Sequence, residues 1–83
     1  MELSFNGFET IIQQDLINTD SPKGGKIPLV LYARKDEAEP DIIYFEAEID
    51  GVSWFTTESI THATILYTML KKHVNEYMRY EKL

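Results

Sequence analysis

The dipeptide Asp50-Gly51, which lies between two runs of alternating residues, constrains the fold most strongly. The run before it, 42–49, and the run after it, 52–57, are rich in β-branched and aromatic residues. Asp-Gly between two such runs is the strongest short-range signal of a β-hairpin, with these two residues forming the turn. The sequence therefore predicts a β-hairpin over 42–57.

The hairpin's register predicts which residues share a face of the sheet. Side chains alternate between the two faces of a strand, so residues directly opposite each other lie on one face. Counting outward from the turn predicts these pairs: Ile49 with Val52, Ala47 with Trp54, and Phe45 with Thr56. We expect this face, together with Ile43, to form the core side.

The opposite face of the predicted hairpin mixes acids with large aromatic residues. Two glutamates at alternate positions of one strand are seldom buried without partners, so we expect this face to reach solvent. Aromatic anchors surrounded by charge are typical of protein-recognition surfaces. The predicted partner-binding residues are Ile42, Tyr44, Glu46, Glu48 and Phe55.

The remaining elements complete a single α+β domain over residues 1–83. Apolar residues at helical spacing predict an N-terminal helix over 8–18, and Gly and Pro residues predict a flexible loop over 19–26. Residues 27–57 then form a three-stranded antiparallel sheet. A 3-4 spacing of apolar residues predicts a long helix over 58–80. The expected order is α-β-β-β-α, with both helices on one face of the sheet.

The predicted C-terminal helix is longer than the sheet that it covers. A helix of ~23 residues is ~35 Å long, whereas strands of this length give a sheet of ~20 to 27 Å. Its apolar end must therefore be covered, either by a second copy of the chain or by the first helix packed across it. We expect a homodimer, with these residues at its interface: Tyr67, Val74, Tyr77 and Met78.

Charge and composition narrow the kinds of partner. Fourteen Asp and Glu against eight Lys and Arg give a net charge of −6, which repels nucleic acid and favours a basic partner. There is no cysteine, and no apolar run approaches the ~18 residues that a membrane span needs. We expect a soluble, cytoplasmic protein that does not associate with membranes.

The sequence contains residue types used in catalysis, but not in catalytic settings. His62 and His73 are eleven residues apart, which on one helix separates them by ~16 Å along the axis, too far to share a metal ion. Ser59, Glu58 and His62 include the residue types of a hydrolase triad, without the strand-to-helix elbow or glycine-built oxyanion hole. The sequence predicts no enzymatic activity, no metal and no cofactor.

The predicted order of elements resembles that of double-stranded-RNA-binding domains. Such a resemblance implies RNA binding through a basic cluster that opens the last helix, where this chain has Glu58 to His62, an acidic to neutral stretch. A nucleic-acid-binding module using Lys23, Lys26, Arg34 and Lys35 is the alternative function. The preferred hypothesis is a non-enzymatic protein-interaction module, acting as a regulator, inhibitor or adaptor. Its sharpest form is an inhibitor whose carboxylates mimic nucleic acid.

Overall fold

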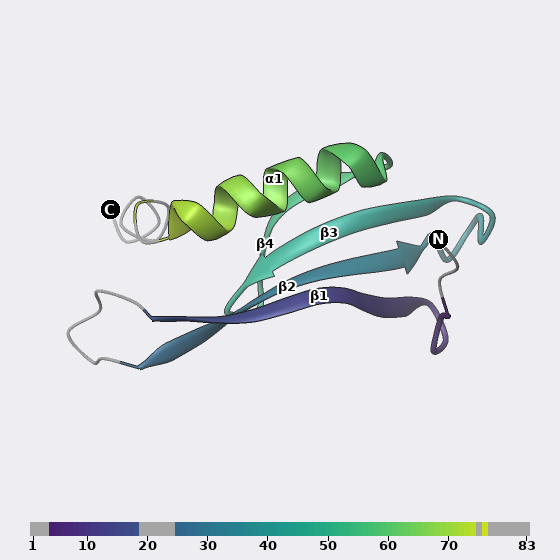
Figure 1. Ribbon diagram of the computed structural model, residues 1–83. Coiled ribbons are helices and arrows are strands. Elements are labelled where there is room, and N and C mark those ends of the chain that lie inside the picture. Colours follow the sequence, from purple (N-terminus) through teal and green to yellow (C-terminus); the bar gives the residue numbers. More distant parts are fainter. Residues whose placement is uncertain (1–3, 19–24, 75, 77–83) are drawn as a thin grey trace.

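A computed structural model describes residues 4–18, 25–74 and 76 of the protein. Four strands precede one helix in this part of the chain (Figure 1). The elements are β1 (Glu9–Asn18), β2 (Lys26–Lys35), β3 (Ile43–Ile49), β4 (Val52–Thr57) and α1 (Ile60–Lys72).

The strands form one antiparallel sheet in the order β1-β2-β3-β4, so each strand pairs with its neighbour in sequence. Helix α1 lies along one face of this sheet (Figure 1). The α+β class, the antiparallel sheet and the C-terminal helix are confirmed. The fold thus leaves the two faces of the sheet in different environments.

The predicted N-terminal helix is wrong, because its residues form strand β1. The strand contains the neighbouring apolar pairs Ile11-Ile12 and Leu16-Ile17. Their spacing suits a helix, and it equally suits a strand in which the alternation between the two faces shifts by one residue. A β-bulge between Ile11 and Gln13 supplies that change of phase. The sheet therefore has four strands instead of three, and the order of elements that resembles double-stranded-RNA-binding domains is lost.

The β3–β4 hairpin turns at the predicted dipeptide, where Asp50 has φ 50° and Gly51 has φ 83°. The pair next to the turn, Ile49 with Val52, is also as predicted. Beyond it, a register shift between Ala47 and Glu48 changes the pairing. The predicted partners of Ala47 and Phe45 are wrong, and the observed pairs are Ala47 with Phe55 and Phe45 with Thr57.

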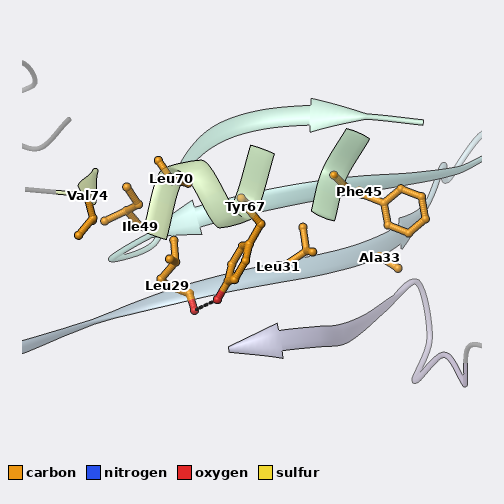
Figure 2. Close-up of a cluster of buried hydrophobic side chains, with 10 residues drawn as sticks. Leu29, Leu31, Ala33, Phe45, Ile49, Tyr67, Leu70 and Val74 are labelled. Atoms are coloured by element: carbon orange, nitrogen blue, oxygen red, sulfur yellow. Dashed lines mark hydrogen bonds between the residues drawn. The ribbon is translucent and has the colours of Figure 1, made fainter. Parts of the chain in front are cut away.

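The core lies between α1 and the covered face of the sheet (Figure 2). Strand β2 contributes Leu29, Leu31 and Ala33, and strand β3 contributes Phe45, Ala47 and Ile49. Four residues at helical spacing meet them from the other side: Ala63, Tyr67, Leu70 and Val74. As predicted, the helix covers the Phe45 side of the hairpin. Trp54 is partly buried and packs against the same cluster.

Helix α1 begins after Ser59, whose hydroxyl accepts a hydrogen bond from the His62 N–H at 3.2 Å. This N-cap stabilises the first turn, which otherwise has backbone N–H groups without partners. The hydroxyl of Thr57, two residues earlier, accepts a hydrogen bond from the Ser59 N–H at 3.2 Å. Residues 19–24 of the predicted loop and residues 77–80 of the predicted helix lie outside the described residues.

Candidate interaction surface

The sheet face opposite α1, here called the outer face, is not covered by any other described helix or strand. Its membership follows from the register, because residues paired across neighbouring strands lie on the same face. Its central residues are Glu9, Ile11, Gln14 and Leu16 on β1, Val30, Tyr32 and Arg34 on β2, Tyr44, Glu46 and Glu48 on β3, and Ser53 and Thr56 on β4.

Arg34 organises the polar part of the outer face. Its guanidinium lies 3.3 Å from a carboxylate oxygen of Glu9 and 3.3 Å from one of Glu48, and it also forms an ion pair with Glu46. One side chain thereby joins carboxylates from β1 and β3 across β2. Such a network restrains its members more than an isolated surface ion pair does.

Two further contacts hold this cluster in place. The Arg34 guanidinium lies 4.3 Å from the centroid of the Tyr32 ring, which is within the range of a cation–π interaction. The Ser53 hydroxyl donates to Glu46 Oε2 at 2.8 Å, which links the cluster to β4. One guanidinium facing three carboxylates gives the cluster a formal charge of +1 − 3 = −2. The outer face is therefore acidic although its arginine is central.

Two shallow hollows lie beside the Arg34 cluster. The first, of about 440 Å³, is lined by Asn6, Phe8, Glu9, Arg34, Lys35, Glu37 and Tyr44. The second, of about 520 Å³, is lined by Asn6, Glu9, Thr10, Ile11 and Tyr32. Both hollows share Glu9, a half-exposed carboxylate, and both contain aromatic carbon. The surface can accordingly receive side chains that are both apolar and cationic.

The outer face also exposes apolar side chains from β1. Ile11 is 51% exposed and Leu16 is 67% exposed. Sequence reasoning missed both as outer-face residues, because this segment is predicted as a helix with its apolar residues turned inward. The signal that identifies a strand here is the density of β-branched residues at 10–12.

The structure places four of the five predicted partner-binding residues on or beside the outer face. Tyr44, Glu46 and Glu48 are part of it, and Ile42 lines a hollow of about 290 Å³ together with Tyr44. Phe55 was placed on the wrong face by the predicted register. It is opposite Ala47 and packs against the core, because the bulge in β4 moves it by one position.

Of the four residues predicted for a dimer interface, the two that the structure describes are buried within the chain. Tyr67 and Val74 are only 1% and 3% exposed, because they pack against the sheet of their own chain. Tyr77 and Met78 lie outside the described residues. On its solvent side, α1 instead exposes Ile65, Leu66 and Met69.

A partly buried network joins α1 to β1 on the covered face. The Tyr67 hydroxyl donates to Asp15 Oδ2 at 2.6 Å, and Lys71 Nζ lies 3.0 Å from Asp15 Oδ1. The hydrogen bond from Tyr67 and the bond to Lys71 lower the pKa of the Asp15 carboxyl. Burial, followed by the bond to Asp15, raises the pKa of the Tyr67 phenol. The network is structural in character, since it ties an edge strand to the helix.

The residue types considered for catalysis are used otherwise. Ser59 caps α1, His62 is exposed, and His73 Nδ1 lies 3.4 Å from the Glu76 carboxylate. Among the described residues, no three His, Asp or Glu side chains are grouped so that they could hold a metal ion. No helix in the described ranges is long and apolar enough to span a membrane.

Comparison of the chain with protein-family models, with curated proteins and with solved structures finds no match.

Proposed function

We propose that this protein is a non-enzymatic protein-interaction module that binds a basic partner protein on its outer face. The observation that carries the proposal is the Arg34 cluster, in which three carboxylates surround one guanidinium on an otherwise uncovered sheet face. A cluster of charge −2 attracts lysine and arginine side chains and speeds their encounter.

The neighbouring side chains supply the apolar part of such a surface. Tyr32 and Tyr44 are half-buried beside the carboxylates, and Ile11 adds exposed aliphatic carbon. Partly buried aromatic residues within a polar rim are the usual energetic centre of a protein interface. We infer that the partner contributes both cations and apolar groups, as an amphipathic basic segment does.

The nucleic-acid alternative is weakened by the ion pairs of Arg34, the arginine that it would use. Arg34 is already bonded to carboxylates, so it has no net positive charge to offer a phosphate. The Lys35 ammonium lies 4.6 Å from the centroid of the Phe5 ring. Protein binding is therefore the better proposal, and the carboxylates of the outer face suit either an adaptor or an inhibitor of a basic surface.

The test is a titration with defined probes followed by amide NMR shifts. An arginine- and leucine-containing peptide is expected to shift resonances of β2 and β3 outer-face residues, more strongly at low salt than at high salt. A charge-reversed glutamate peptide and a short DNA duplex are expected to leave them unchanged.

Two double variants of equal net charge separate a local effect from a global one. Glu9→Gln with Glu48→Gln removes two carboxylates from the outer face, whereas Glu39→Gln with Glu76→Gln removes two exposed carboxylates elsewhere. We expect only the first to weaken binding of the basic peptide, by about tenfold, which corresponds to ~1.4 kcal/mol. Equal weakening in both variants, or shifts caused by DNA, would refute the proposal.

A further inference from the structure

Strand β1 is an edge strand. One of its sides pairs with β2, and no described strand pairs with the other side (Figure 1). It is ten residues long, whereas the opposite edge strand, β4, has six residues. A long edge that carries exposed apolar side chains is a template for another strand. Soluble proteins usually either block such an edge or use it.

Backbone hydrogen bonds show which residues of β1 direct their N–H and C=O groups to the open side of the strand. The Lys35 N–H donates to the Phe8 carbonyl at 2.8 Å, so Phe8 faces β2, and the Asn6 N–H donates to the Glu9 carbonyl at 3.0 Å on the other side. The Pro28 carbonyl accepts from Asp50, so Pro28 faces away from β1 and does not bond to its opposite residue, Leu16. Because bonding alternates along an antiparallel strand, Ile11, Gln14 and Leu16 direct their N–H and C=O groups to the open side of β1, whereas the Glu9 carbonyl on that side already accepts from Asn6.

The side chains of β1 are arranged so that the strand is complementary to a second copy of itself. Along the outer face, Ile11 and Gln14 are three residues apart because of the bulge, and Gln14 and Leu16 are two apart. Consider an antiparallel copy related by a two-fold axis at Gln14. Ile11 then lies opposite Leu16 of the copy, and Ile12 and Gln13 together oppose its Asp15. In the β1–β2 pair, too, the two bulge residues lie opposite a single residue, Leu31 of β2.

Charge also permits this pairing, although each chain has a net charge of −6. Neither acid of the strand is placed against an acid: Asp15 opposes the bulge of the copy, and Glu9, which pairs with Asn6 of its own chain, lies at the end of the paired stretch. Asp15 is moreover held by Tyr67 and Lys71 of its own chain. Like charges directly opposite each other destabilise strand pairs, and this register has none.

We propose that a second copy of the chain pairs antiparallel with β1 through this edge, so that the four strands of each copy join in one continuous sheet. Ile11 and Leu16 of each copy cover one another on the outer face. Homodimerisation is thereby assigned to β1 instead of the C-terminal helix. The Arg34 cluster is centred on β2 and β3, so the strand pairing does not require the basic partner, although Ile11 belongs to both surfaces.

Crosslinking tests the position of the axis directly. The protein has no cysteine, so Gln14→Cys introduces a single thiol that lies beside its own copy across the axis. Bonded residues opposite each other in antiparallel strands have Cα atoms ~5.5 Å apart. A short bis-maleimide is expected to convert the 9.7 kDa chain into a species of twice that mass. The control variant, Ile65→Cys on the exposed side of α1, is expected to remain uncrosslinked.

Sedimentation of edge variants supplies the second test. Gln14→Pro removes an N–H that points away from β2, so no hydrogen bond to β2 is lost. Edge strands tolerate proline at such positions. Leu16→Lys places a charge in each of the two symmetry-related contacts between Leu16 of one copy and Ile11 of the other. Both are expected to weaken dimerisation by about tenfold or more, whereas Leu66→Lys on α1 leaves it unchanged. A wild-type monomer at all concentrations, or loss of the dimer only in Leu66→Lys, would overturn the proposal.

Discussion

The Tyr67 hydroxyl of α1 donates its proton to Asp15 of β1, 52 positions earlier in the chain, at 2.6 Å. The Leu29 carbonyl, 3.1 Å from the hydroxyl oxygen, is a second acceptor for the same proton (Figure 2 shows the latter contact). Tyr67 is among the most buried large side chains of the protein. One phenol therefore fixes the helix against both β1 and β2. The relationship explains how an edge strand that makes few contacts with the helix is held in the fold.

Removing this hydroxyl is expected to destabilise the protein. Tyr67→Phe keeps the ring in the core but leaves the Leu29 carbonyl and Asp15 without their donor, so we expect a loss of about 1 to 2 kcal/mol in the free energy of unfolding. Urea denaturation followed by circular dichroism measures it. The matched control, Tyr44→Phe on the outer face, is expected to change stability by less than about 0.5 kcal/mol. Equal losses in the two variants would show that the Tyr67 bonds contribute nothing specific.

The Asp15 carboxylate should make stability depend on pH. Its pKa in the folded protein is lowered by the bonds from Tyr67 and Lys71, so its contribution is complete above the unfolded pKa of about 3.9 and is lost as the pH falls through the folded value. Asp15→Asn is expected to be less stable than wild type at pH 7, with a difference that shrinks toward pH 3. Urea denaturation at pH 7, 5 and 3 tests this, and a difference that stays constant with pH would contradict it.

The bulge in β4 predicts a contrast between two aromatic residues that alternation alone places on one face. Phe55 packs against the core, so Phe55→Ala is expected to cost about 2 kcal/mol, somewhat below the range for a fully buried phenylalanine. Tyr44→Ala on the outer face is expected to cost less than about 1 kcal/mol. Thermal unfolding of the two variants decides between the registers. A larger loss in Tyr44→Ala would favour the register without the bulge.

The Arg34 cluster predicts a partly compensated double variant. Arg34→Gln leaves Glu46 and Glu48 close together without their cation, and we expect a loss of about 1 to 2 kcal/mol, because both carboxylates are mostly shielded from solvent. Adding Glu46→Gln removes one of the two charges and should restore part of the loss. A double-mutant cycle in urea measures this coupling. Additive losses would mean that Arg34 contributes by packing rather than by charge.

Several elements could be predicted because their signals are local. The Asp50-Gly51 turn depends only on which residues tolerate positive φ, and the alternation of β3 and the 3-4 spacing of α1 depend on which residues avoid water. These signals also placed Tyr44, Glu46 and Glu48 on the face away from the helix. That part of the candidate site was accessible without coordinates.

The errors arise where two patterns are compatible with the same residues. Residues 9–18 satisfy helical spacing, yet they form a strand, because pairing with β2 satisfies their backbone groups and attaches Asp15 to Tyr67. Phe55 was misplaced because a bulge adds one residue to a strand without a distinctive sequence mark. The first error concerns hydrogen bonds between distant segments, which no local window contains, and the second concerns the pairing register inside one hairpin.

The sequence by itself determined the hairpin, the C-terminal helix, the acidity of the chain and the segregation of Glu46 and Glu48 from the core. Tertiary structure alone decided that residues 9–18 add a strand, β1, with an open edge to the three predicted strands. It also decided that Arg34 brings carboxylates of β1 and β3 together. The physical reason is that backbone propensity and burial are properties of short segments. Strand pairing, register and ion-pair geometry instead depend on which distant segments come to lie side by side.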